Sequence, residues 1–230
     1  MLILAFETSA KAASVALHDG KKLLGESYQN TGLTHSQTLM VMAEDLLKQC
    51  GKKACDVTAV AVAEGPGSFT GVRIGVAAAK GFAWGAELPC YGVSTLEAMA
   101  KSLGIYQGYV CPAMDARRSQ VYNALFYVNC GKLTRICPDR AISLQDLGED
   151  VKNLQEPIFL VGDGSVLCYN SLLEEIPGLV LPPEHKRHQR AVGVGLAALE
   201  SVPCDPAAMS PNYLRLSQAE RERAERLAKQ

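Results

Sequence analysis

The sequence predicts an α/β protein with two domains, each built on a mixed β-sheet covered by helices. Three observations support this fold class. Short apolar runs of strand length alternate with segments of helical periodicity along most of the chain. Asp19-Gly20 between two such runs is a hairpin signature. A strand, a glycine turn and a helix follow one another twice, at 57–84 and at 158–174, and 230 residues are enough for two domains of ordinary size.

The first domain is expected over residues 1–103, with the element order βββαβαβα. Two hairpin-linked strands followed by alternating helices and strands predict a mixed sheet, with ligands at the strand ends where turns gather. Its strands are expected at 2–8, 13–18, 23–28, 57–63 and 88–91.

Helical spacing and capping patterns locate the helices of this domain. Thr34 with Gln37, and Ser94 with Glu97, have the spacing of a capping box, in which each side chain bonds the other residue's backbone N–H. Apolar residues recur at helical spacing after each pair. Helices are therefore expected at 34–50, at 70–84 and from 94 onward.

The second domain, residues 104–216, is richer in strands, and a charged tail at 217–230 follows it. The tail is almost entirely Glu, Arg, Lys, Ala and Gln, which is typical of a solvated helix or a frayed end. A helix at about 189–201 is expected to return to the first domain. Strands are expected at 110–114, 121–128, 132–136, 158–161 and 179–181, and helices near 144 and at 166–174.

Composition excludes several classes of protein. A net charge of -1 with no basic excess argues against independent binding to nucleic acid, which needs clustered Lys and Arg. No apolar stretch reaches the roughly 20 residues of a membrane span, so no membrane association and a cytoplasmic location are expected. The eight cysteines contain no CxxC pair, so neither a disulfide framework nor a zinc site is indicated.

The most informative segment is VAEGPGSFTGVRIG at 62–75, where an apolar strand runs through a glycine turn into a helix. Such a turn directs backbone N–H groups and a helix N-terminus at one point, as phosphate-binding loops do. It is not a Walker A loop, because no Gly-Lys-Ser/Thr ends it. Taken alone, a glycine turn also fits a purely structural connection.

Several motifs together resemble one bacterial family. They are Phe6-Glu7-Thr8-Ser9 at the hairpin, GPGSFTG, VGDGS, MDARRSQVY at 114–122 and PNYLRLSQAE at 211–220. Over almost its whole length the chain resembles the TsaB (YeaZ) family, which belongs to the machinery that makes N6-threonylcarbamoyladenosine beside the anticodon of tRNA. The resemblance implies the two-domain fold of actin, Hsp70 and the sugar kinases (ASKHA, ribonuclease H-like).

The resemblance also implies a non-catalytic relative of the catalytic subunit TsaD. In TsaD a helix opens with two histidines four residues apart, and residues at that spacing lie on one helical face and can share a metal. Thr95 and Met99 stand at the matching positions here. Neither is a suitable ligand, so no metal and no catalytic residue are expected.

The glycine turns and the end of the first strand are expected to line a vestigial or weak nucleotide cleft. No cofactor is expected to bind tightly, although ATP or ADP at a partner interface fits the turns. Asp115 and Asp163 are equally well explained as turn residues. The expected cleft residues are Glu7, Thr8, Ser9, Gly65, Gly67, Ser68, Gly71, Gly162, Asp163 and Gly164.

Two helices are expected to form a protein interface. Gly71, Gly75 and Ala79 recur every four residues, and glycine within a helix costs about 1 kcal/mol relative to alanine, so a close contact with a partner or the sheet is expected. The resemblance implies a four-helix bundle with TsaD, or a homodimer when TsaD is absent. The expected interface residues are Leu39, Met40, Ala43, Leu47, Gly71, Gly75, Ala78, Ala79 and Phe82.

The resemblance further implies the ATPase TsaE as a partner, and contact with tRNA only through the complex. One alternative is an active small-molecule kinase or nucleotide hydrolase of the same fold, which would use Glu7. A peptidase is a second alternative, but the chain has neither a GxSxG nor an HExxH motif. His35 and the basic run 185–190 are expected to be solvent-exposed.

Overall fold

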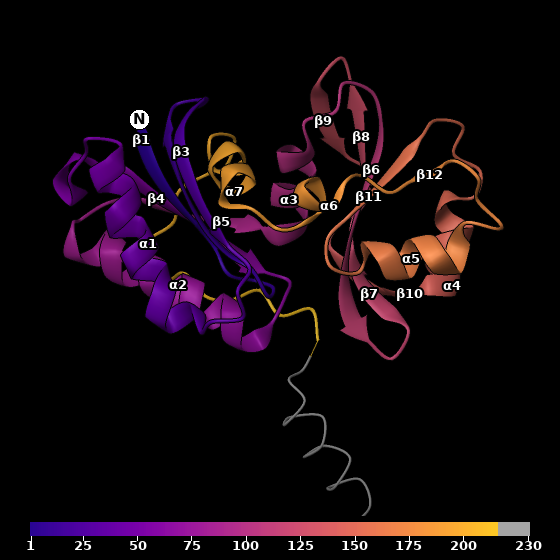
Figure 1. Ribbon diagram of the computed structural model, residues 1–230, viewed down its shortest axis with the longest axis horizontal. Coiled ribbons are helices and arrows are strands. Elements are labelled where there is room, and N and C mark those ends of the chain that lie inside the picture. Colours follow the sequence, from indigo (N-terminus) through magenta and orange to yellow (C-terminus); the bar gives the residue numbers. More distant parts are fainter. Residues whose placement is uncertain (216–230) are drawn as a thin grey trace, which may run out of the picture.

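In the computed structural model, which describes residues 1–215, the chain forms two lobes that lie side by side (Figure 1). Lobe 1 is built on a five-stranded sheet in the order β3-β2-β1-β4-β5. The first three strands are antiparallel neighbours, and β1, β4 and β5 run parallel. These strands are β1 (Leu2–Glu7), β2 (Ala13–Asp19), β3 (Lys22–Gln29), β4 (Ala59–Gly65) and β5 (Cys90–Ser94).

Helices cover both faces of this sheet. Because side chains alternate along a strand, Leu4 and Phe6 of β1 face the core beneath α1 (His35–Gln49) and α2 (Phe69–Gly85). Ile3 and Ala5 face the opposite core, which α7 (Ala191–Ala198) and α3 (Thr95–Leu103) cover. Figure 1 shows α1 and α2 together on one side of the sheet and α7 on the other.

Lobe 2 contains a seven-stranded sheet in the order β10-β7-β6-β11-β12, with β8 and β9 attached through β6. Its strands are β6 (Gly108–Arg117), β7 (Gln120–Asn123), β8 (Phe126–Asn129), β9 (Lys132–Arg135), β10 (Arg140–Ser143), β11 (Ile158–Val161) and β12 (Leu179–Val180). The remaining helices are α4 (Leu144–Val151), α5 (Ser165–Leu172), α6 (Glu184–Arg187) and a 3-10 turn η1 (Ala54–Asp56).

The strand expected at 121–128 is divided into β7 and β8. Both pair with β6, but the ladder is interrupted opposite Pro112, which has no N–H to donate. The buried amide of Asn123 fills the gap by donating to the carbonyl oxygens of Pro112 and Ala124, each at 2.9 Å. The single-strand prediction was therefore wrong at Ala124 and Leu125, and β10 was not predicted.

The two expected capping boxes differ. Thr34 precedes α1 but its side chain makes no capping hydrogen bond, so that prediction was wrong. Ser94 does cap α3, since its Oγ accepts from the N–H of Glu97 at 3.2 Å. The carboxylate of Glu97 does not complete the box, because it binds Arg135 of lobe 2 at 2.9 Å.

Helix α7 lies in the part of the chain expected to return to the first domain, and it packs on lobe 1 after the chain has built lobe 2. A side chain at Gly193 would overlap the carbonyl of Ala98, so glycine permits the close contact between α7 and α3. The expected tail at 217–230 lies outside the described residues. None of the helices within residues 1–215 is both long enough and apolar enough to cross a membrane.

Candidate functional site

Three buried polar residues, Glu7, Thr8 and Ser9, lie at the C-terminal end of β1, of which Glu7 is the last residue. The N–H of Ser9 donates to Glu7 Oε1 at 2.5 Å, and Thr8 Oγ1 donates to the carbonyl of Gly71 at 2.7 Å. Glu7 Oε2 and Ser9 Oγ have no hydrogen-bond partner within residues 1–215. The end of β1 is therefore fixed to the start of α2.

The glycine turn between β4 and α2 packs directly on this segment. A Cβ atom at Gly67 would lie 2.5 Å from the carbonyl oxygen of Ser9, and one at Gly71 or Gly75 would overlap Thr8. The small face of α2 therefore allows close approach to the chain's own β1. The sequence left open whether these glycines pack against a partner or against the sheet. In the structure they pack against the sheet of lobe 1.

Ser68 forms two hydrogen bonds with residues of the same chain. Its N–H donates to the carbonyl of Ser9 at 2.7 Å, and its Oγ accepts from the N–H of Gly71 at 3.3 Å. Two backbone N–H groups that a phosphate loop would direct at a ligand are thus bonded internally.

A C-terminal strap, residues 209–215, covers the same turn. The N–H of Asn212 donates to the carbonyl of Glu64 at 2.6 Å, and a side chain at Gly65 would overlap the carbonyl of Asn212. The Tyr213 ring stacks on Phe69 with centroids 3.9 Å apart. The sequence prediction missed this contact, because the PNYLRLSQAE motif gives no sign of which segment it packs on.

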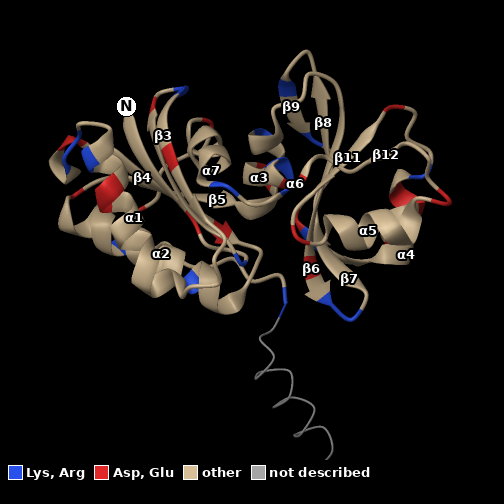
Figure 2. Ribbon diagram, viewed as in Figure 1, with Lys and Arg blue, Asp and Glu red and all other residues tan. Residues whose placement is uncertain are grey.

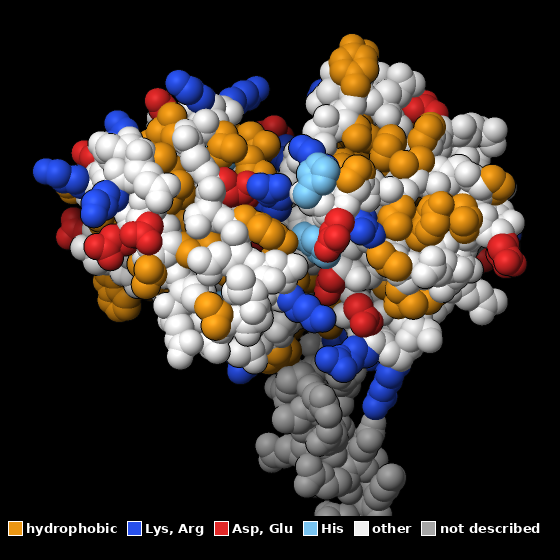
Figure 3. All heavy atoms as spheres, in the orientation of Figure 1, with side chains coloured by type: hydrophobic (Ala, Val, Ile, Leu, Met, Phe, Trp, Pro, Cys, Tyr) orange, Lys and Arg blue, Asp and Glu red, His pale blue; other side chains and the backbone are white. Residues whose placement is uncertain are grey.

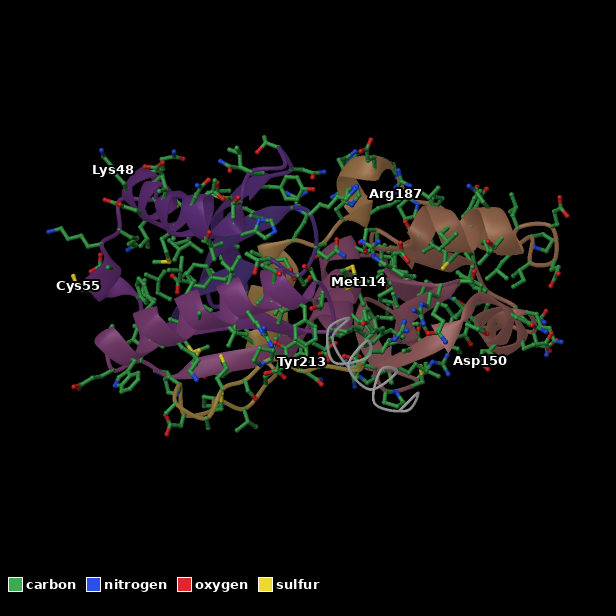
Figure 4. The ribbon with its side chains drawn as sticks, turned by 90° about the horizontal axis from the view of Figure 1, so that it is seen from below. Lys48, Cys55, Met114, Asp150, Arg187 and Tyr213 are labelled. Carbon is green, nitrogen blue, oxygen red and sulfur yellow. The ribbon has the colours of Figure 1, made fainter. Side chains whose placement is uncertain are left out.

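The strap also reaches lobe 2. Arg73 of α2 donates to the hydroxyl of Tyr213 at 2.7 Å, and Arg215 donates to the carbonyl of Ala116 on β6 at 2.7 Å. Figure 4 shows Tyr213 at the boundary between the lobes. One short segment therefore contacts both lobes where the first glycine turn lies.

The second glycine turn, Gly162 to Gly164, lies at the end of β11 in lobe 2. Gly162 has φ +101°, and a side chain there would overlap the carbonyl of Ala113. Asp163 accepts a hydrogen bond from the buried amide of Gln189 at 3.1 Å. As in lobe 1, the glycines permit close packing of backbone on backbone.

The carboxyl of Glu7 at the end of β1 interacts electrostatically with that of Asp163 in the second turn. Burial raises the pKa of Glu7 to about 7, the hydrogen bond from the Ser9 N–H opposes this rise, and the charge of Asp163 adds to it. Desolvation of its carboxyl also raises the pKa of Asp163, the hydrogen bond from Gln189 lowers it, and the charge of Asp115 raises it. Glu7 and Asp163 therefore influence each other's ionisation across the two lobes.

Thr95 and Met99, the residues that the family resemblance matches to the histidines of the catalytic relative, lie buried on α3. The sulfur of Met99 packs against Gly162. Within residues 1–215, no three His, Cys, Asp or Glu side chains are arranged to hold a metal ion.

The expected interface residues divide into two sets. The core of lobe 1 buries six of them, so they cannot contact a partner in this fold: Leu39, Ala43, Leu47, Gly71, Gly75 and Ala79. The prediction was wrong for this set, because the stripe of small residues faces the sheet. Met40 is 43% exposed, and Ala78 and Phe82 are half-buried at the surface.

Further apolar residues extend the exposed part of α1 and α2. Val41 is 57% exposed and Trp84 is 72% exposed, and Ala77 is also exposed. We call Met40, Val41, Ala77, Ala78, Phe82 and Trp84 the outer face of α1 and α2. A space-filling view shows hydrophobic side chains on the surface of both lobes and a notch between them (Figure 3).

The basic run 185–190 is less solvated than expected. Its first residues form part of α6, and the carbonyl of Arg187 accepts from the N–H of Gly162 at 2.6 Å. Gln189 is buried, and Arg190 binds the carboxylate of Glu26. His35 Nε2 lies 2.8 Å from the carbonyl of Ala10, so it too has a contact within the fold. Figure 2 shows acidic and basic residues spread over both lobes.

The comparisons with known proteins agree with these features. The family model described as TsaD, tRNA N6-adenosine threonylcarbamoyltransferase, matches residues 29–157. A Bacillus subtilis protein, tRNA threonylcarbamoyladenosine biosynthesis protein TsaB, is 32% identical over 222 residues, which cover 96% of each chain. The chain belongs to the TsaB family.

Solved structures agree with this family. The structure titled YeaZ from Pseudomonas aeruginosa has a TM-score of 0.73 and 26% identity, covering 93% of this chain and 99% of that one. The ethanolamine utilization protein EutJ from Carboxydothermus hydrogenoformans, at 13% identity and a TM-score of 0.52, covers 86% of this chain and 90% of that one and shares the fold alone. The predicted actin/Hsp70/sugar-kinase-like fold and the predicted family are confirmed.

Proposed function

We propose that this chain is a non-catalytic scaffold subunit for the synthesis of N6-threonylcarbamoyladenosine in tRNA. It binds the catalytic relative TsaD and activates it for transfer of threonylcarbamoyl from its adenylate to the tRNA adenosine. The observation that carries the proposal is full-length similarity to a protein named for this pathway. The resemblance adds that Thr95 and Met99, both buried, stand where the catalytic relative has histidines.

The two glycine turns support the non-catalytic part. Their glycines pack against Thr8, Ser9 and Ala113 of the same chain, and the strap lies across the first turn. The N–H groups of Ser68 and Gly71 are bonded within the chain, so they are not available to a phosphate. ATP or ADP would then bind only where a partner completes the site.

The outer face of α1 and α2 supports the scaffold part. It exposes Met40, Val41 and Trp84 from two adjacent helices, and exposed apolar surface of this kind marks protein interfaces. Methionine adapts to more than one partner surface, which suits a face that binds TsaD and, in its absence, a second copy. A protein with no catalytic residues can change its partner's reaction rate only by binding one conformational state of that partner more tightly than the other. This is the role that we propose for the chain.

The other assignments follow from the same proposal. The ATPase TsaE acts on the assembled complex, and the complex forms in the cytoplasm. The chain contacts tRNA only within the complex, since its charges are mixed over both lobes.

The interface can be tested by measuring TsaD binding to a Met40→Glu variant. We expect the variant to remain folded and to lose most of its affinity, because a charge would be buried at the contact. Val166→Glu is the matched control, since Val166 is also 43% exposed on a helix but lies in lobe 2. Equal binding by the two variants would refute the interface.

The activity can be tested by reconstituting tRNA modification from TsaD, TsaE and the adenylate synthase, with and without this chain. The proposal predicts modification only when the chain is present, and negligible turnover by the chain alone. The alternative of an active kinase or nucleotide hydrolase predicts turnover in isolation that Glu7→Gln abolishes. That result would replace the scaffold proposal.

A further inference from the structure

Two cysteines from distant parts of the chain lie opposite each other in lobe 1. Cys90 is the first residue of β5, and Cys204 lies on the segment that leads from α7 to the strap. They form an isolated antiparallel β-bridge, in which the N–H of Cys204 donates to the carbonyl of Cys90 at 2.8 Å. Both are free thiols.

The geometry of such a pair is compatible with a disulfide. Residues directly opposite in an antiparallel bridge project their side chains to the same side, with Cα atoms about 4.5 to 5.5 Å apart. Disulfides span Cα separations of about 4.4 to 6.8 Å. The Cys204 thiol lies 3.4 Å from the carbonyl oxygen of Cys90, so it is placed directly against the residue with which it would bond.

The two thiols differ in access. Cys90 is fully buried and its thiol lies 3.6 Å from the sulfur of Met209, whereas Cys204 is half-buried. An external reagent can therefore reach Cys204 first. Cys90 can remain buried, because it reacts only with the adjacent sulfur of Cys204 and not with the external reagent.

We propose that Cys90 and Cys204 are a redox-active pair, which a low-molecular-weight disulfide such as oxidised glutathione converts reversibly into an intramolecular disulfide. The Cys204 thiolate attacks one sulfur of oxidised glutathione, forming a mixed disulfide and releasing one glutathione thiolate. The Cys90 thiolate then attacks Cys204 Sγ, forming the Cys90–Cys204 bond and releasing the second glutathione. Two protein thiols lose two protons and two electrons, and one glutathione disulfide becomes two thiols.

The second step is the slow one. Burial raises the pKa of Cys90 to about 12, and the neighbouring Cys204 thiol adds to this rise. Formation of the mixed disulfide removes the contribution of Cys204, because its sulfur no longer ionises. Ring closure should still accelerate roughly tenfold per pH unit between about pH 7 and 9, since the thiolate is the reacting form.

The disulfide would attach the segment that precedes the strap to β5 of the lobe 1 sheet. Lys80 of α2 already holds the start of the strap, because its Nζ donates to the carbonyls of Ala207 and Met209, each at 3.0 Å. A covalent bond at Cys204 would hold the residues around it on β5, independently of the contacts that the strap makes with lobe 2. Oxidation should therefore slow amide hydrogen exchange over residues 205–215.

The test uses the intact protein incubated with oxidised glutathione, then alkylated, digested and mapped by mass spectrometry. We expect a Cys90–Cys204 cross-linked peptide that dithiothreitol removes. Cys111 and Cys168 are the internal control, because they also neighbour each other but are both fully buried, so they should remain thiols. A map in which Cys204 carries glutathione while Cys90 stays alkylatable after unfolding would overturn the proposal.

Variants separate the two steps. In Cys90→Ala the mixed disulfide at Cys204 should accumulate, and in Cys204→Ser the thiol of Cys90 should stay reduced. Cross-linking of Cys90 to another cysteine in Cys204→Ser would contradict the assigned pair. Circular dichroism of each variant checks that it is folded, and the wild-type map decides the question by itself if a variant fails to fold.

Discussion

Replacing Gly71 by alanine tests whether the small face of α2 is a packing surface of lobe 1. The new methyl group would overlap the backbone carbonyl of Thr8, the residue that directly follows the paired strand β1. Overpacking of this kind costs about 1 to 3 kcal/mol, and weakening the bond from Thr8 Oγ1 to the Gly71 carbonyl costs about 1 kcal/mol more. The higher helix propensity of alanine returns up to about 1 kcal/mol.

The net expectation is a loss of about 2 kcal/mol in the free energy of unfolding. With a urea dependence of about 2 kcal/mol per molar, the unfolding midpoint falls by about 1 M. The assay is urea unfolding followed by far-ultraviolet circular dichroism.

Gly81→Ala is the matched control on the same helix. Nothing lies within 4 Å of a Cβ atom at Gly81, so only the helix propensity changes and the midpoint should rise by about 0.5 M. If both variants shifted in the same direction, close packing of α2 on Thr8 would not be the reason for Gly71. The argument that this face is unavailable to a partner would then fail as well.

Three further predictions concern charges and the strap. Because the folded-state pKa of Glu7 is about 7 against an ordinary 4.5, the folded protein retains a proton that the unfolded chain releases between these values. The free energy of unfolding of the wild type should therefore fall by up to about 3 kcal/mol more than that of Glu7→Gln as pH rises from 4.5 to 7, in urea titrations at each pH; parallel profiles would contradict it. Arg190→Met should cost about 3 kcal/mol, because the nearly buried Glu26 carboxylate loses its cation, and adding Glu26→Gln should restore most of this in the same assay. Tyr213→Phe should keep the ring stack but lose the bond from Arg73, so the strap should exchange amide hydrogens faster than wild type but slower than Tyr213→Ala.

The local signals in the sequence were sufficient for most elements of lobe 1. Hairpin chemistry at Asp19-Gly20 and the helical spacing after Thr34 depend on neighbouring residues, and the structure has the strands and the helix there. The division of 121–128 could not be predicted this way. It depends on the missing N–H of Pro112 on the paired strand, which only the register reveals.

The site shows the same limit. The glycines at 65, 67 and 71 were recognised, but a small side chain equally suits a phosphate, a partner or the chain's own backbone. Which of these lies opposite depends on Thr8 and Asn212, both distant in sequence. For the same reason the buried and exposed faces of α2 could not be assigned from helical periodicity alone.

The late position of α7 has a consequence for how the protein is made. The sheet of lobe 1 is synthesised by residue 94, yet the helix that covers Ile3 and Ala5 begins only at Ala191. During translation only α3 is therefore available to cover this apolar side of the sheet while the ribosome produces all of lobe 2. A fragment that ends after α3 should for this reason aggregate or recruit chaperones, even though it contains every strand of its sheet.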